Sequence, residues 1–81
     1  MKAHVYVTLK KTVLDPQGAT IARALQGMGH REIASVRQGK FFEIEVDCAD
    51  RQQARALLER IAEDVLSNPV IEEFRVELAG E

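Results

Sequence analysis

Cysteine is almost absent from this chain, because Cys48 is the only one among 81 residues. A single cysteine excludes a disulfide within the chain and a metal site built from several cysteines. Asp47 and Asp50 stand close to it in the sequence, and their carboxylates disfavour the thiolate that a nucleophilic cysteine needs. We therefore interpret Cys48 as a small packing residue.

Excess charge and long apolar runs are absent too. The formal net charge of −2 gives no general attraction to nucleic acid or to an anionic membrane. The N-terminal sequence MKAHVYVTLKK alternates polar with apolar residues, so it lacks the continuous apolar stretch of a signal peptide or membrane span. We expect a cytoplasmic protein that binds neither nucleic acid nor membrane.

Residue sets for catalysis or metal binding are also missing from the sequence. His4 and His30 fall on different predicted elements, and neither has the close His, Asp or Glu spacing of metal ligands. We find neither a supported Ser, His and Asp set nor a glycine-rich nucleotide loop. We therefore expect no catalytic residue, no cofactor site and no metal site in this chain.

What the chain does have is the composition of one small globular domain, which we assign to residues 1–81. Hydrophobic residues make up 46% of the chain and charged residues 30%. A domain of this size buries only about 60% of the surface that its unfolded chain exposes. Such a domain is marginally stable alone, so we expect it to associate with a partner.

Hydrophobic residues repeat every second position in some segments and every three to four positions in others. In chain order, these periods predict strand, helix, strand, strand, helix and strand, at residues 3–9, 18–28, 32–38, 40–46, 54–65 and 74–78. Gly39, within RQGK, suits a hairpin turn between the two middle strands. Both helices have one apolar stripe, which favours two layers. We predict an α+β fold of order β-α-β-β-α-β, ferredoxin-like, with an antiparallel sheet and both helices on one face.

The run VLDPQG marks the start of the first predicted helix. Asp15 is suited to the N-cap and Pro16 to the first helical position. Gly18 then falls in the first turn, where glycine costs roughly 1 kcal/mol relative to alanine. Two interpretations stay open: another chain approaches Gly18 closely, or the glycine eases a tight strand-to-helix turn.

The sheet face that the helices leave open is predicted to carry aromatic and charged side chains together. It is either an ordinary sheet face with cross-strand aromatic pairs, or an association surface with aromatic anchors inside a polar rim. Base stacking on RNA is disfavoured because two glutamates beside Phe41 would repel phosphates. The residues assigned to this face are His4, Tyr6, Thr8, Lys10, Phe41, Glu43, Glu45, Glu73, Arg75 and Glu77, with Ile33 beside them.

Three stretches, LKKTVLDPQG, VRQGKFFEIEV and LSNPVIEEFRVE, together resemble the PurS family, the small subunit of phosphoribosylformylglycinamidine (FGAM) synthase. The resemblance covers nearly the whole chain. It implies a non-catalytic subunit of a C–N ligase complex in de novo purine biosynthesis, which uses ATP and glutamine. It also implies that the chain bridges a large synthetase subunit and a glutaminase subunit, assists ammonia transfer, and forms homodimers or homotetramers.

Carried onto this sequence, the resemblance implies interface residues rather than catalytic ones. Residues 15–18 would form a shaped helix entry, and residues 37–40 a cationic hairpin tip that faces an acidic patch on a partner. The alternative function is a small-molecule-sensing regulatory domain of similar topology. The candidate interface residues are Tyr6, Lys10, Asp15, Pro16, Gly18, Arg37, Lys40 and Phe41.

Overall fold

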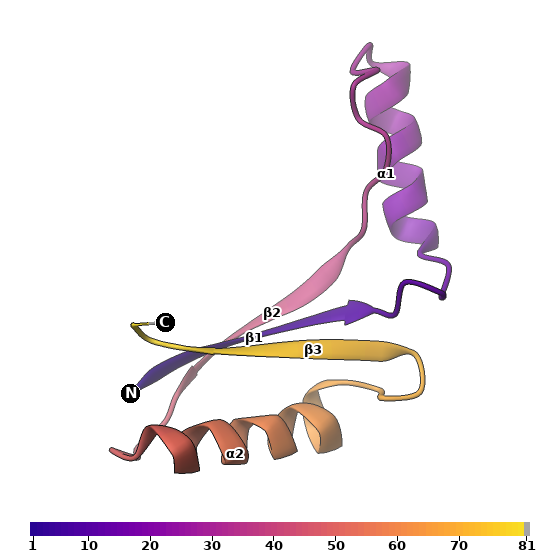
Figure 1. Cartoon of the computed structure of the whole chain (residues 1–81). Helices are drawn as coiled ribbons and strands as arrows, with labels where there is room; N and C mark the ends of the chain where they lie inside the picture. The colour runs from indigo at the N-terminus through magenta and orange to yellow at the C-terminus, as the bar shows by residue number, and fades with distance from the viewer. Residues whose placement is uncertain (81) are drawn as a thin grey trace.

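Three strands form one antiparallel sheet, with the first strand of the chain in its centre (Figure 1). β1 (Lys2–Leu9) pairs with β2 (Gly39–Glu45) on one side and with β3 (Glu72–Leu78) on the other. Both outer strands run antiparallel to β1, so they run parallel to each other, and the chain between them must cross the sheet. The computed structural model describes residues 1–80, and over that range the architecture is α+β.

The helix α2 (Arg51–Ile61) makes this crossing and covers one face of the sheet (Figure 1). It begins where the Asp50 carboxylate accepts hydrogen bonds from the backbone N–H groups of Gln52 and Gln53, at 2.9 and 3.3 Å. These bonds satisfy donors that the first helical turn leaves without partners. Asp50 is therefore the N-cap of α2.

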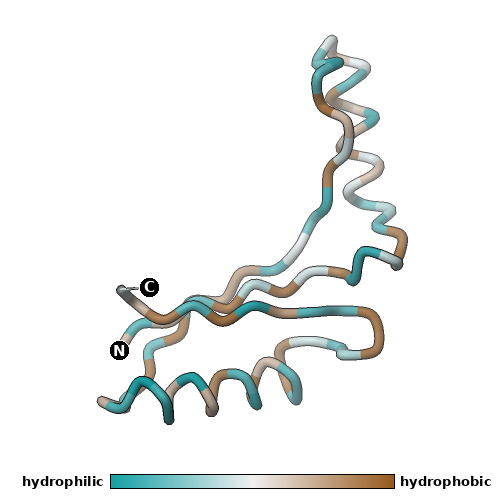
Figure 2. Tube along the Cα trace, viewed as in Figure 1, coloured by the Kyte–Doolittle hydropathy of each residue, from teal (hydrophilic) through white to brown (hydrophobic). Residues whose placement is uncertain are grey.

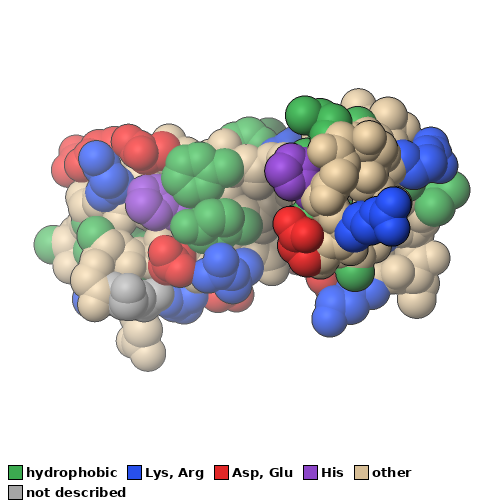
Figure 3. Space-filling model, turned by 90° about the horizontal axis from the view of Figure 1, so that it is seen from above, with side chains coloured by type: hydrophobic (Ala, Val, Ile, Leu, Met, Phe, Trp, Pro, Cys, Tyr) green, Lys and Arg blue, Asp and Glu red, His purple; other side chains and the backbone are tan. Residues whose placement is uncertain are grey.

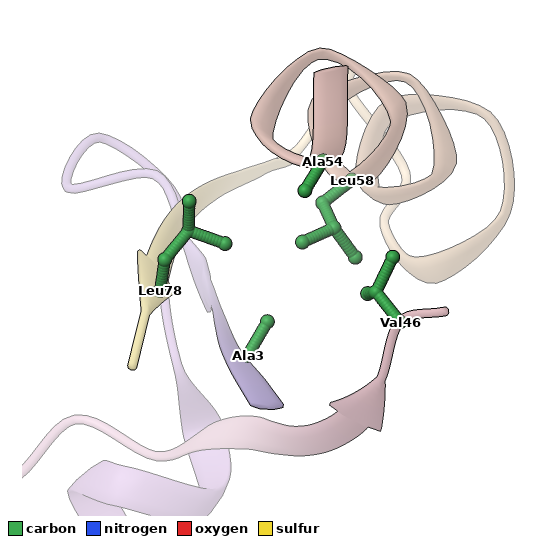
Figure 4. Packing of buried hydrophobic residues seen from close by; sticks show 5 residues of the cluster. All are labelled: Ala3, Val46, Ala54, Leu58 and Leu78. Carbon is green, nitrogen blue, oxygen red and sulfur yellow. The ribbon is translucent and has the colours of Figure 1, made fainter. Parts of the chain in front are cut away.

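The hydrophobic core lies between α2 and the sheet. Figure 4 shows Ala54 and Leu58 pointing from the helix toward side chains of the sheet end. The alternation predicted for β1 is confirmed, because Ala3, Val5 and Val7 are buried in this layer and Leu9 is partly buried. The buried members of the core are Ala3, Val5, Val7, Val46, Ala54, Leu58, Ala62 and Leu78.

A π-helical turn, η1 (Ala62–Leu66), follows α2 directly. Its wider turn is closed by the Ser67 backbone N–H, which donates to the Ala62 carbonyl at 2.9 Å. The change of pitch brings Leu66 into the core beside Ala62 and leaves the Val65 side chain 75% exposed. The prediction that Val65 belongs to the buried helical stripe is therefore wrong, since that stripe assumed uninterrupted α-helical spacing.

This shift in register predicts different changes in the free energy of unfolding for substitutions at two neighbouring residues. Leu66→Ala should lower the free energy of unfolding by about 1–2 kcal/mol, because it removes packed methyl groups from a half-buried site. Val65→Ala is the matched control and should change it by less than about 0.5 kcal/mol. Urea unfolding followed by circular dichroism measures both. A larger loss at Val65 than at Leu66 would contradict the π-helical register.

The helix α1 (Pro16–Gly27) does not lie on the sheet. It stands at one end, on the side away from α2, and the following residues return beside it to β2 (Figure 1). The Gln26 side chain ties the two passes together by donating to the Ile33 carbonyl at 2.9 Å. We call residues 10–38 the arm, and the rest of the described chain the body.

Two predictions about the arm are wrong. Residues 32–38 form no strand, and residues 37–40 form no hairpin turn, so the described sheet has three strands instead of four. The two helices do not share one face either, because only α2 covers the sheet. The hydrophobic pattern of this segment suggested a strand, but its nearest neighbour is α1, which offers no ladder of backbone groups.

The arm makes the molecule long rather than compact. The Cα radius of gyration is 15.9 Å and the principal extents are 49 × 27 × 14 Å, whereas a compact chain of this length has a radius of gyration of about 12 Å. Only Gly18 and Ala22 are buried in α1, while Ile21 and Met28 of its apolar stripe are 41% and 73% exposed. Figure 2 shows hydrophobic residues recurring along this uncovered part of the chain.

Candidate functional site

Asp15 fixes the base of the arm. This buried carboxylate accepts the Gly18 backbone N–H at 2.9 Å and the Gln38 backbone N–H at 2.7 Å. One side chain therefore caps α1 and also holds the returning segment where it enters β2. The predictions of Asp15 as N-cap and Pro16 at the first helical position are confirmed.

The hydrogen bonds at Asp15 also hold its carboxyl group in the ionised form. The N–H of Gln38 contributes most to lowering the pKa of Asp15 below 3.8, followed by the N–H of Gly18. Burial acts in the opposite direction, and the nearby Arg37 guanidinium lowers the pKa further. The net result is a lowered pKa, so the folded arm favours the carboxylate.

This lowered pKa predicts how the stability of the arm depends on pH. The folded pKa of Asp15 lies below the unfolded value, so its contribution is complete above the unfolded pKa and is lost as pH falls through the folded pKa. Asp15→Asn keeps an oxygen acceptor and cannot titrate. The stability advantage of the wild type over this variant should therefore be constant above about pH 5 and shrink as the pH falls below about pH 4. Hydrogen exchange at the Gln38 amide measures this, and a pH-independent advantage would contradict it.

Arg37 clamps the loop that leads into α1. Its Nη2 atom donates to the carbonyls of Lys10 and Val13 at 2.9 and 3.0 Å, and to that of Leu9 at 3.4 Å. The prediction of Arg37 in a cationic hairpin tip is therefore wrong, because its guanidinium binds the chain's own backbone. Lys40, the other cation of that tip, lies 3.8 Å from Glu72 across the sheet.

Position 18 has no side chain because another segment of the same chain passes close to its backbone. A Cβ atom built there would meet the carbonyl oxygen of Val36 at only 2.2 Å and a carboxylate oxygen of Asp15 at 2.8 Å. The interpretation that another chain fills this space is wrong, since Gly18 is buried by residues of the arm. The strand-to-helix turn is not the reason either, because the obstacle is a segment eighteen positions further along the chain.

The open face of the sheet has an aromatic cluster at its centre, as the alternation predicted. Phe41, which is 56% exposed, lies with its ring centroid 5.2 Å from that of Tyr6 and 5.1 Å from that of His4. The Arg75 guanidinium sits 4.2 Å above the Tyr6 ring and pairs with Glu77 at 2.7 Å. We call these five residues the aromatic face.

Charged groups surround the aromatic face, and Figure 3 shows the hydrophobic side chains flanked by acidic, basic and histidine side chains. Glu43 lies 3.5 Å from Lys2 and 3.9 Å from His4. Ile33, which was placed beside this face, lies in the arm instead, because the segment that carries it forms no strand. The arrangement has the aromatic centre and polar rim of an association surface.

The described chain offers little to a metal or a reacting substrate. Residues 1–80 contain no group of three or more His, Cys, Asp or Glu side chains that could hold a metal ion. Every buried side-chain nitrogen or oxygen atom in that range has a hydrogen-bond partner, so none is held free to bind a ligand. No helix in the same range has the length and apolar character needed to cross a membrane.

Sequence reasoning missed three features of this site. It did not assign Arg37 to backbone carbonyls, did not pair Asp15 with Gln38, and did not bring Val36 against Gly18. Gly18 was the one usable signal for these contacts, because a glycine in the first turn of a helix indicates that another group occupies the space of the missing side chain. Nothing in the sequence indicated that a segment of the arm itself occupies this space.

The fold and these surfaces together define a small α+β chain whose distinctive side chains lie on an exposed sheet face and a projecting arm. Residues 2–80 match the PurS family, described as phosphoribosylformylglycinamidine (FGAM) synthase. The chain belongs to the PurS family, as its sequence resemblance implied.

Relatives match this chain along nearly its whole length. The PurS subunit of the synthase from Bacillus subtilis is 42% identical over 77 residues, covering 95% of this chain and 90% of that protein. The PurS subunit from Mycobacterium leprae is 45% identical over 75 residues, covering 93% and 91%.

Solved structures share the fold as well. A crystal form of Bacillus subtilis PurS superposes with a TM-score of 0.83 at 42% identity and covers 94% of each chain. A chain in the structure of PurLQS from Thermotoga maritima superposes with a TM-score of 0.86 at 32% identity, covering 94% of this chain and 93% of that one. The three-stranded sheet and its projecting helix are therefore an arrangement that this chain shares with PurS proteins.

Proposed function

We propose that this chain is a non-catalytic subunit that joins the large synthetase subunit of FGAM synthase to its glutaminase subunit in the cytoplasm. In this role it assists the passage of ammonia from the glutaminase to the synthetase. The complex uses ATP and glutamine, whereas this chain binds no cofactor. Its contribution is to hold the other two subunits in a fixed position relative to each other.

The similarity to a chain of the Thermotoga maritima PurLQS structure supports this proposal most strongly. That chain comes from an assembly that also contains PurL and PurQ, and the match leaves almost none of either chain uncovered. A small protein with this fold is thus used as a component of the synthase. The same use accounts for an exposed aromatic face and for a projecting arm whose apolar stripe the described chain leaves uncovered.

The structure divides the candidate interface residues into two groups by what their side chains already contact. Asp15, Gly18 and Arg37 are engaged inside the arm, so we assign them the role of shaping it. The exposed or partly exposed residues can meet another chain directly, and these are Tyr6, Lys10, Pro16, Lys40 and Phe41.

Self-association is part of the proposal. The apolar stripe of α1 is uncovered in the described chain, with Leu14 and Met28 more than 70% exposed at either end of it. Burying such residues stabilises a chain by roughly 25 cal/mol per Å² of apolar surface. We propose a homodimer or homotetramer within the complex.

Assembly from purified components tests the joining role. This chain, the large subunit and the glutaminase should elute together in size-exclusion chromatography with light scattering, and the glutaminase should elute separately when this chain is omitted. Phe41→Ser should weaken assembly at least about five-fold, because it removes the centre of the aromatic face. Leu57→Ser is the matched control, since Leu57 is 47% exposed on α2. Co-elution of the other two subunits without this chain would contradict the proposal.

A further inference from the structure

The turn between η1 and β3 holds two apolar side chains at the surface, and we call its residues 68–71 the tip. The Val70 side chain is 77% exposed and that of Ile71 is 39% exposed. Neither residue belongs to the hydrophobic core clusters of the described chain. Their apolar surface is therefore available to another molecule.

Hydrogen bonds centred on Asn68 fix the shape of the tip. Its carbonyl accepts the backbone N–H groups of Ile71 and Glu72 at 3.1 and 2.7 Å, and its side-chain oxygen accepts that of Val70 at 3.1 Å. Its own backbone N–H donates to the Glu72 carboxylate at 2.7 Å. Pro69 occupies the second position of this turn, where its fixed φ angle suits the backbone. A partner therefore meets Val70 in a preformed position, which reduces the conformational entropy lost on binding.

Two lysines near the tip have no carboxylate partner among the described residues. The backbone N–H of Lys10 donates to the Ile71 carbonyl at 2.9 Å, so the start of the arm runs beside the tip at the same end of the sheet (Figure 1). Lys10 is partly exposed and Lys11 exposed, and neither forms an ion pair within residues 1–80. Glu72, the carboxylate of the turn itself, already pairs with Lys40 at 3.8 Å. This surface therefore combines apolar side chains with unpaired positive charge.

We propose that the tip inserts into an apolar depression, rimmed by carboxylates, on another subunit of the synthase. This inference rests on the proposed function and deepens it by assigning a contact surface. Val70 and Ile71 bury their apolar surface in the depression, while Lys10 and Lys11 pair with the carboxylates of its rim. An apolar anchor of this kind, surrounded by charged groups, supplies a large share of the binding free energy from a few residues.

Hollows on this chain do not offer such a depression to the tip of a second copy. The two beside α1 are lined by no Asp or Glu side chain. The hollow on the open side of the sheet has Glu73 but also Arg75. The hollow at the base of the arm has Asp15 and Glu72, which are engaged by backbone N–H groups and by Lys40. None of these hollows has unpaired carboxylates around an apolar centre, so a different subunit fits the tip better than a second copy does.

Val70→Ser tests the apolar part of the contact in the assembled complex. It should weaken assembly of this chain with the synthetase and glutaminase subunits at least about five-fold, measured by light scattering over a series of concentrations. Val65→Ser is the matched control, because Val65 is 75% exposed on η1 and lies outside the tip. The control should assemble within about 1.5-fold of the wild type, and both variants should melt within about 2 °C of it.

Lys11→Glu tests the charged part of the contact. It should weaken assembly at least about three-fold at low ionic strength, and the loss should shrink as salt is added, because salt screens surface charges. Arg60→Glu makes the same change of charge at an exposed position on α2. This control should leave assembly within about 1.5-fold of the wild type.

Assembly of the Val70→Ser variant as tight as that of the wild type would overturn the inference, and so would an equal loss in the Val65→Ser variant. Weaker self-association of the Val70→Ser chain on its own would overturn it too, because the tip would then meet a second copy. These outcomes leave the joining role standing whenever the wild-type chain co-elutes with both other subunits. Failure of the wild-type chain to co-elute would instead reject the joining role itself, and this contact with it.

Discussion

Gly18→Ala should open the arm. The new Cβ would lie 2.2 Å from the Val36 carbonyl oxygen, so the returning segment must move away from α1. That movement pulls Gln38 from the Asp15 carboxylate, which is one of the hydrogen bonds that hold the base of the arm. Strain of this kind typically costs about 1–3 kcal/mol, and here the obstacle is backbone that cannot change rotamer. Loss of hydrogen-exchange protection at the Gln38 amide measures the opening.

Gly27→Ala is the matched control, because it makes the same chemical change at the other end of α1. A Cβ there meets no atom within 4 Å. The substitution should therefore stabilise the helix by about 0.5–1 kcal/mol, which is the ordinary gain of alanine over glycine. The two substitutions should thus have opposite signs. Equal protection at Gln38 in both variants would contradict the contact assigned to Val36.

The sequence was sufficient to predict the body of the fold. The period of two placed Val5 and Val7 on the buried face of β1, and the structure shows both fully buried. The N-cap Asp15 was readable because the side chain that begins a helix is close in sequence to the N–H groups it binds. Signals of this kind depend on residues that are close in sequence, so they can be interpreted from the sequence alone.

The arm could not be predicted, because its arrangement depends on partners distant in sequence. Residues 32–38 were predicted to form a strand from their hydrophobic pattern, yet the described chain supplies no strand to pair with them. The apolar stripe of α1 predicted a packing surface, and the prediction assumed that this surface is the chain's own sheet. A hydrophobic stripe on a helix indicates that another surface covers it, but it does not identify that surface.

The candidate site likewise has some features that the sequence predicts and others that it does not. Tyr6 and Phe41 were correctly placed together on the open face, because alternation along two strands fixes which side chains share a side. The role of Arg37 could not be read, since three carbonyls more than twenty positions away define it. Lys40 was read as free, and the strand across the sheet supplies Glu72 to it.

Removal of this chain should have a large effect on the rate of the reaction that the whole complex catalyses. If this chain holds the glutaminase against the synthetase, its removal should separate the source of ammonia from the site that consumes it. The rate with glutamine should then fall at least about ten-fold, because ammonia released into solution is diluted before it reacts. The rate with an ammonium salt as nitrogen source should stay within about two-fold, since that route needs no glutaminase.

The most direct test of the account is the rate of FGAM formation by the large subunit and the glutaminase, measured with glutamine as nitrogen source, with and without this chain. We predict a rate that depends on this chain with glutamine and does not depend on it with ammonium. An unchanged glutamine-dependent rate in its absence would contradict the claim that the chain acts by joining its partners.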